Sequence, residues 1–306
     1  MISIVGAGRI GSASAFNILR MRIADVILVD VQEGLAEGEA LDLIQSSPAI
    51  EFDGKIMGSA RISDIEGSDI VIVAAGVPRK PGMSRSELLE RNAEIVSKIV
   101  DEIVRYAPES KIMMVTNPVD VMTYLAYRRS GSERNRVFGM GGILDTLRYR
   151  SYIALELNVS REDIRALVIG EHGDHMTPLV DYTTISGIPV RDFLDEKTIG
   201  RIVERTISGG SDVISLKGGT VYAPAAVIAV MAEAVIRGRN RVMTASVVPS
   251  GEYGLRNIAI GLPVVLGENG VERILELPLD DATMGSLMQS AKMIKSAIEK
   301  ISLSPH

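Results

Sequence analysis

The feature that most constrains the fold is a glycine-rich turn close to the N-terminus. Residues 2–5 predict a short strand, and the run Gly6 to Gly11 (GAGRIG) leads from it into a helix-like segment that extends to about residue 20. Gly6 permits a tight turn, Gly8 lets the backbone approach a pyrophosphate, and Gly11 lets the helix pack closely on the strand. The pattern predicts a dinucleotide-binding strand–turn–helix unit whose helix N-terminus faces the phosphates.

A second apolar segment, residues 26–29, ends in Asp30, which lies 19 residues beyond Gly11. At this place a carboxylate can accept hydrogen bonds from both hydroxyl groups of an adenosine ribose. It would also repel a 2′-phosphate, so Asp30 favours NAD over NADP as the cofactor. The alternative is that Asp30 is a turn former that follows a strand.

Apolar strands and amphipathic helices continue to alternate along the first half of the chain. Such strands predict a parallel sheet with helices on both faces, in which ligands bind at the carboxyl ends of the strands. Gly76 and Asn117 each follow a strand, so we expect them to face the same crevice as Gly6. The expected strands are 70–75 and 111–116, and the expected helices are 33–44, 86–106 and 119–128. In the second half of the chain, a helix is expected at 191–208.

The segment from Gly76 to Arg85 joins a strand to a helix and contains two prolines, two glycines and three cations. This composition is typical of a surface loop. Since the segment starts at the carboxyl end of a strand, it can close over the site, and its basic side chains suit an anionic substrate. The alternative is a solvated basic loop with no role in binding.

The chain has three histidines, and two of them lie in the segment Gly170 to His175 (GEHGDH). Proton transfer by imidazole near neutral pH must therefore use this segment, because the third is the C-terminal residue. Asp145 and Arg148 are three residues apart on a predicted helix and share one face of it. The alternatives are a structural histidine in a turn and a surface ion pair.

The composition excludes several classes of protein. The chain has no cysteine, which excludes disulfides and Cys-ligated metals, and three histidines make a His-rich metal site improbable. The net charge of −6 and the lack of basic clusters interleaved with aromatic residues argue against a nucleic-acid partner. We find no signal peptide and no apolar run long enough to span a bilayer, so we expect a cytoplasmic protein without a membrane partner.

Four sequence blocks in the same order resemble the malate/lactate dehydrogenase family of NAD-dependent 2-hydroxy acid dehydrogenases. These blocks are GAGRIG, PRKPGMSR, TNPVD (residues 116–120), and the pair ILDTLR with GEHGD; KGGTVYA near residue 220 matches as well. The match runs nearly from end to end. It implies a Rossmann-type doubly wound parallel sheet at residues 1–141, followed by an α+β substrate domain at 142–306, and a homodimer or homotetramer.

The resemblance also implies a role for individual residues. His172 corresponds to the proton donor and acceptor, Asp145 to the carboxylate that orients it, and Arg148 to the arginine that binds the substrate's C1 carboxylate. Arg85 corresponds to a lid arginine that polarises the carbonyl. Asn117 and Thr220 correspond to substrate contacts. The residues expected to bind the cofactor are Gly6, Gly8, Arg9, Ile10, Gly11, Asp30, Gly76, Asn92, Thr116 and Asn117.

Arg79 points to the small-molecule substrate, because the malate enzymes of this family carry an arginine where lactate enzymes carry glutamine. A second guanidinium pairs with a second carboxylate, which favours oxaloacetate and malate, whereas pyruvate would leave it buried and unpaired. A lactate dehydrogenase is the nearest alternative. Another alternative is an NAD-dependent glycosidase, which shares this fold but relies on a metal typically held by Cys and His, and this chain lacks Cys. The last is a non-catalytic nucleotide sensor, which would not need His172, Asp145, Arg148 and Arg85 together.

Overall fold

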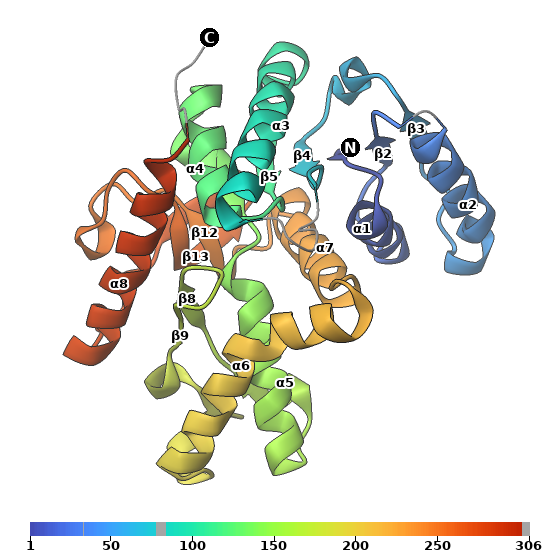
Figure 1. The fold of residues 1–306 in the computed structure, drawn as a ribbon. Coiled ribbons are helices and arrows are strands. Elements are labelled where there is room, and N and C mark those ends of the chain that lie inside the picture. The colour runs from blue at the N-terminus through green and yellow to red at the C-terminus, as the bar shows by residue number, and fades with distance from the viewer. Residues whose placement is uncertain (33, 78–83, 302–306) are drawn as a thin grey trace.

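The computed structural model describes residues 1–32, 34–77 and 84–301, and it confirms a mixed α/β fold with a parallel Rossmann-type sheet (Figure 1). The first half of the chain forms the parallel part of one large sheet, in the order β3-β2-β1-β4-β5-β6. Its elements are β1 (Ile2–Val5), α1 (Arg9–Arg20), β2 (Val26–Val29), α2 (Leu35–Ile50), β3 (Ile56–Ser59), β4 (Ile70–Val73), α3 (Arg85–Tyr106), β5 (Lys111–Met114), α4 (Val119–Ser130) and β6 (Val137–Gly139).

The three central strands β1, β2 and β4 are buried at every position, which explains why their sequences are continuously apolar and do not alternate. Ile4 lies between Leu28 of β2 and Ile72 of β4 in register. The order of the strands reverses at β1, since β2 and β4 lie on opposite sides of it. This reversal opens a crevice at the carboxyl ends of these strands.

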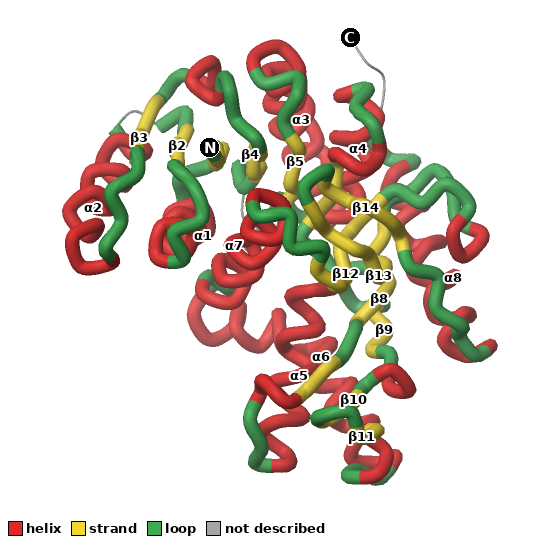
Figure 2. The backbone as a smooth tube through the Cα atoms, turned by 180° about the vertical axis from the view of Figure 1, so that it is seen from behind, coloured by secondary structure: helices red, strands yellow, loops and turns green. Residues whose placement is uncertain are grey.

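The second half continues the same sheet with antiparallel strands, in the order β6-β12-β13-β8-β9, and β14 pairs with β13. Ser246 of β12 pairs with Gly139 of β6, which joins the two halves. A small separate sheet contains β7, β10 and β11 (Figure 2). The elements are α5 (Gly142–Leu157), β7 (Ile164–Arg165), β8 (Val168–Gly170), β9 (Met176–Pro178), β10 (Thr184–Ile185), β11 (Ile188–Pro189), α6 (Glu196–Lys217), α7 (Tyr222–Ile236), β12 (Arg241–Val247), β13 (Ile260–Gly267), β14 (Gly270–Ile274) and α8 (Asp281–Ile298).

Helix α2 differs from its predicted range, 33–44: its predicted first residue lies outside the described residues, and it continues six residues further, to Ile50. The extension includes Pro48, which cannot donate a hydrogen bond to the carbonyl of Ile44. The hydroxyl of Ser47 donates to that carbonyl instead, at 2.7 Å. The side chain therefore replaces the missing backbone bond, and the helix passes through the proline.

Helix α6 was expected at residues 191–208, and this prediction is wrong at both ends. The helix begins after Asp195, whose carboxylate accepts a hydrogen bond from the amide of Thr198 at 2.8 Å and so caps the N-terminus. It then continues through Gly209 and Gly210 to Lys217.

Strands β4 and β5 are each two residues shorter than expected, because the chain turns into the crevice after Val73 and Met114.

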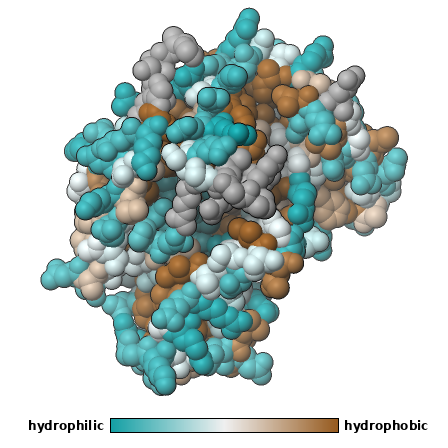
Figure 3. All heavy atoms as spheres, viewed as in Figure 1, coloured by the Kyte–Doolittle hydropathy of each residue, from teal (hydrophilic) through white to brown (hydrophobic). Residues whose placement is uncertain are grey.

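The surface seen in Figure 3 is mainly hydrophilic, with apolar side chains in scattered patches. Helix α7 packs on α1, and α6 packs on α5 (Figure 1). Within the described residues, none of the helices is both long and apolar enough to cross a membrane.

Candidate active site

The glycine turn forms one wall of a cavity at the carboxyl ends of β1, β2 and β4. Gly6 has a φ of +106°, and a Cβ added to it would lie 2.5 Å from the backbone nitrogen of Ala75. A Cβ on Gly11 would lie 1.9 Å from the carbonyl oxygen of Gly6, so neither position has room for a side chain. Gly8 instead borders open space, which leaves its backbone accessible to a ligand. Arg9 and Ile10 open helix α1 beside it.

The cavity has a volume of about 590 Å³ and includes four of the residues that were predicted to bind the cofactor: Gly6, Gly8, Asp30 and Gly76. Apolar side chains such as Ile95 and Ile99 of α3 line much of the remainder. A cleft of this size, apolar apart from a few polar groups at fixed positions, fits the adenosine part of a dinucleotide.

Asp30 also holds the glycine turn in place. Its Oδ2 accepts a hydrogen bond from the amide of Ala7 at 2.8 Å, and its Oδ1 accepts one from the amide of Gln32 at 2.9 Å. Each carboxylate oxygen has a second lone pair, so these bonds leave acceptor capacity for ribose hydroxyls. The carboxylate therefore holds the turn and also lines the cavity with acceptor capacity to spare.

Asn92 of α3 connects two loops at the edge of the crevice. Its Oδ1 accepts a hydrogen bond from the amide of Val77 at 2.9 Å, and its Nδ2 donates to the carbonyl of Asn117 at 2.8 Å. The side chain of Thr116 is engaged similarly, because its hydroxyl donates to the carbonyl of Ala75 at 2.7 Å. Asn92 and Thr116 thus support the loops through their side chains, whereas Asn117 itself is exposed.

The structure brings together His172, Asp145 and Arg148. Nδ1 of His172 lies 2.6 Å from Oδ2 of Asp145, and Nη1 of Arg148 donates to the other oxygen, Oδ1, at 2.8 Å. Asp145 is fully buried in α5, and His172 follows β8 directly after a turn at Gly170, which has a φ of +90°. One carboxylate therefore orients both the imidazole and the guanidinium.

A bond between α5 and β8 explains how these residues meet. The amide of Val168 in β8 donates to the hydroxyl of Thr146 in α5 at 3.0 Å. Thr146 follows Asp145 in the helix, and Val168 precedes the loop that carries His172. The bond therefore fixes the first residue of β8 beside the buried carboxylate, and the strand then leads to the loop of His172.

The environment of His172 favours the protonated imidazole. Burial lowers its pKa, but the Asp145 carboxylate more than offsets this effect, and Asp120 adds to the increase while Arg148 opposes it. The net result is a pKa above the ordinary value of 6.5. Because Nδ1 faces Asp145, the neutral ring carries its proton on Nδ1, and Nε2 is the nitrogen that exchanges a proton with a ligand.

Asp120 belongs to the site, but our sequence analysis gave it no role. It is 3% exposed; its Oδ2 accepts a hydrogen bond from the backbone amide of His172 at 2.8 Å, and its Oδ1 accepts one from the hydroxyl of Ser246 at 2.6 Å. Burial raises its pKa to about 6, although both bonds oppose this increase. The sequence did contain a signal for this residue. Asp120 is an acidic residue in the first turn of α4, and it stands among the apolar residues Val119, Val121 and Met122, all of which are buried.

Besides Asn117, three expected site residues are not brought into this cluster by the described contacts. Arg79 lies outside the described residues. Arg85 opens α3, where Ser84 caps the helix by accepting a hydrogen bond from the amide of Glu87 at 3.0 Å; the Arg85 side chain is not among the described groups. Thr220 is half-buried in the short segment between α6 and α7.

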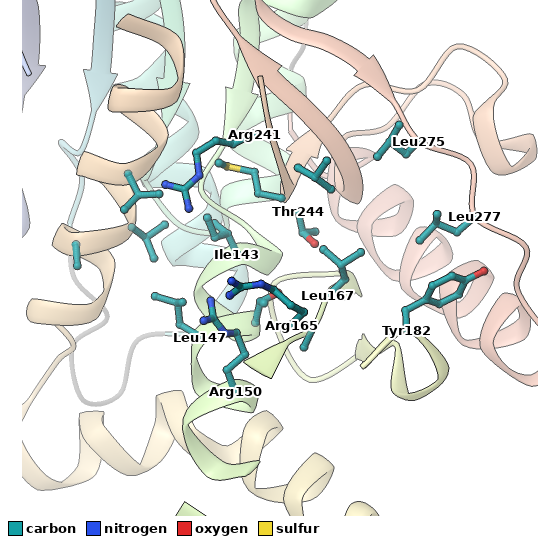
Figure 4. Close-up of a pocket in the computed structure, with 17 residues that line it drawn as sticks. Ile143, Leu147, Arg150, Arg165, Leu167, Tyr182, Arg241, Thr244, Leu275 and Leu277 are labelled. Atoms are coloured by element: carbon teal, nitrogen blue, oxygen red, sulfur yellow. The ribbon is translucent and has the colours of Figure 1, made fainter. Parts of the chain in front are cut away.

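A second cavity, of about 680 Å³, contains none of the predicted site residues (Figure 4). Arg150, Arg165 and Arg241 extend toward it from α5, β7 and β12. Burial lowers the pKa of Arg150, and the like charges of the other two arginines lower it further. Ile143 and Leu147 of α5 also line this cavity, whereas Asp145 and Arg148 of the same helix do not. Helix α5 thus separates the cavity from His172.

Comparisons with known proteins cover almost the whole chain. Residues 1–139 match the family model described as lactate/malate dehydrogenase, NAD binding domain, and residues 143–303 match the lactate/malate dehydrogenase, alpha/beta C-terminal domain. A malate dehydrogenase of Roseiflexus sp. is 48% identical over 299 residues, which cover 97% of each chain.

Solved structures give the same result. The apo malate dehydrogenase from Picrophilus torridus superposes with a TM-score of 0.95 at 39% identity, covering 97% of this chain and 96% of that one. The lactate dehydrogenase from Cryptosporidium parvum, in complex with lactic acid and nicotinamide adenine dinucleotide, superposes with a TM-score of 0.94 at 35% identity, covering 97% and 96%.

Proposed function

The chain belongs to the lactate/malate dehydrogenase family, and from this we propose that it is an NAD-dependent malate dehydrogenase that interconverts (S)-malate and oxaloacetate. The observation that carries the proposal is the contact of 2.6 Å between His172 and the buried Asp145, together with Arg148 on the same carboxylate. An imidazole with a raised pKa beside a guanidinium is suited to a 2-oxo acid, which needs a proton at one oxygen and a cation at its carboxylate.

In the direction of reduction, the imidazolium of His172 donates the proton from Nε2 to the C2 oxygen of oxaloacetate. Asp145 stabilises the charged ring before transfer and keeps it in the required tautomer afterwards. The nicotinamide cofactor, when bound, supplies the hydride that C2 accepts, and it takes the hydride back in the oxidation of malate. In that direction neutral His172 removes the proton of the C2 hydroxyl.

Arg148 binds the C1 carboxylate of the substrate. Asp145 occupies Nη1, so the edge formed by Nε and Nη2 is the one that offers two parallel donors. By the resemblance to the family, Arg85 polarises the carbonyl, Thr220 and Asn117 line the pocket, and Arg79 pairs with the second carboxylate. This role of Arg79 distinguishes the proposal from a lactate dehydrogenase; the relatives of 43–48% identity that are named malate dehydrogenase also favour it.

NAD is the proposed cofactor, bound by the glycine turn and Asp30. The carboxylate faces the cavity beside Gly6 and Gly8, where a 2′-phosphate would meet a negative charge.

We further propose a homodimer or homotetramer, because α2 exposes Leu41 and Ile44 on its surface. Light scattering of the purified protein would measure the mass of the assembly; the cytoplasmic location stays a prediction from the sequence.

The first experiment is an initial-rate assay that follows the absorbance of reduced cofactor. NADH and NADPH are each combined with oxaloacetate and with pyruvate. Rapid turnover with NADH and oxaloacetate, and little with the other combinations, is the expected result. A preference for pyruvate would contradict the role of Arg79, a preference for NADPH would contradict that of Asp30, and binding without turnover would favour a nucleotide sensor.

A further inference from the structure

Helix α6 contains two adjacent glycines, Gly209 and Gly210, in the middle of its 22 residues. Glycine is among the least favourable residues in a helix interior, so a pair of them weakens the helix unless packing requires it. The predicted helix ended at Ser208, directly before this pair. A site where local preference and tertiary structure disagree is often a functional one.

The two glycines lie where α6 crosses α5. The guanidinium of Arg205 lies over the ring of Tyr152, with its Cζ 4.5 Å from the ring centroid. One turn further along α6, a Cβ on Gly209 would lie 2.7 Å from the hydroxyl oxygen of Tyr152. Gly210 instead faces the next turn of α5, where Arg148 is located. The ends of two α5 side chains, the hydroxyl of Tyr152 and the guanidinium of Arg148, therefore fill the space beside these glycines.

A Cβ on Gly210 would meet the guanidinium of Arg148 at three atoms: Nη2 at 3.2 Å, Nη1 at 3.3 Å and Cζ at 3.4 Å. All three distances are shorter than the optimal separation of non-bonded heavy atoms, about 3.5–4.0 Å. The guanidinium cannot simply withdraw, because its Nη1 is bound to Asp145 at 2.8 Å and the side chain is only 15% exposed. A methyl group at position 210 would thus require the guanidinium to shift by a few tenths of an ångström from its present place.

We propose that Gly210 is a positioning residue that sets the place of the Arg148 guanidinium and, through it, the affinity for the substrate carboxylate. The inference rests on the proposed function, in which Arg148 binds that carboxylate. Asp145 holds the guanidinium from one side, and the bare backbone of α6 limits it from the other. A bidentate contact with a carboxylate depends on such a fixed fork.

The test is Gly210→Ala, assayed by steady-state kinetics with NADH and oxaloacetate. We expect the KM for oxaloacetate to rise roughly tenfold while kcat changes by less than about twofold, because the lost contact binds substrate and transition state alike. The melting temperature should stay the same or rise, since alanine favours the helix. An unchanged KM would overturn the proposal.

Gly200→Ala is the matched control, because Gly200 lies in the same helix with no atom within 4 Å of an added Cβ. This variant has the same gain in helix propensity, and its KM should equal that of the wild type. An equal rise in KM in both variants would overturn the proposal, because the effect would then belong to the helix as a whole.

The double variant Gly210→Ala/Arg148→Lys gives an independent readout. Lysine has no Nη atoms for the new methyl group to meet, so the substitution at 210 should add no further increase to the KM of Arg148→Lys. If Gly210→Ala does not fold but the double variant does, the result supports a clash between the methyl group and the Arg148 guanidinium. If neither variant folds, the proposal is overturned. Wild-type turnover tests the proposed function separately; should the wild type prefer another 2-oxo acid, the variants are compared with that substrate.

Discussion

Replacing Asp120 with asparagine would remove a buried charge while keeping the shape of the side chain. Burial raises the pKa of this carboxyl from 3.8 to about 6 in the folded protein. At pH 8 the folded state therefore holds an ionised group at a cost of roughly 3 kcal/mol relative to the unfolded chain. The two hydrogen bonds, from His172 and Ser246, offset part of the cost of burial and are already included in this pKa.

The raised pKa fixes the sign of the pH dependence. Between pH 3.8 and about 6 the folded protein binds more protons at Asp120 than the unfolded chain does, so rising pH lowers the free energy of unfolding. Above pH values of about 6 the carboxyl group is ionised in both states, and its titration lowers the free energy of unfolding no further. Acidification from pH 8 to pH 5 should thus restore about 1.4 kcal/mol of stability to the wild type, and this contribution is absent in Asp120→Asn.

The assay is urea unfolding of both proteins at pH 8 and pH 5, at one protein concentration. The difference in unfolding free energy between wild type and variant should change by about 1.4 kcal/mol between the two pH values. The charged groups that act on Asp120 are His172 and Glu171, and both are present in the two proteins. Because Asp120 contributes to the raised pKa of His172, the same comparison is repeated in a His172→Asn background, where this coupling is absent. An equal difference at both pH values would refute the reasoning.

Three further predictions concern turnover. His172→Asn should lower kcat at least roughly a hundredfold while NADH binding, measured by fluorescence titration, stays nearly unchanged, because the proposed cofactor contacts lie in the other half of the chain; normal turnover would exclude the proton-transfer role. Asp145→Asn removes the carboxylate that raises the imidazole pKa, so the fall of kcat/KM for oxaloacetate with rising pH should move to lower pH, and a profile that does not move would contradict this. Arg79→Gln should lower kcat/KM for oxaloacetate far more than for pyruvate; similar losses with both substrates would contradict the assigned contact.

The sequence was sufficient to predict a feature wherever the residues that form it are close together along the chain. The glycine turn, Asp30 after the second strand, and Asp145 with Arg148 on one helical face all follow from short-range spacing. The parallel order of the first strands followed from their continuous apolar character, which the structure confirms with complete burial of β1, β2 and β4. The roles of the catalytic residues came from the resemblance to a family and not from spacing alone.

Only the tertiary structure decided the features that depend on distant residues. Asp120 meets Ser246 across 126 positions of sequence and the amide of His172 across 52, and no local pattern indicates either contact. The helix predicted at residues 191–208 continues through Gly209 and Gly210, because the packing of α6 on α5 outweighs the weak helix preference of two residues. Local chemistry thus determined the elements and the reactive groups, whereas the packing of helices and strands from both halves determined which groups share buried space, because burial and close contact arise only once distant segments meet.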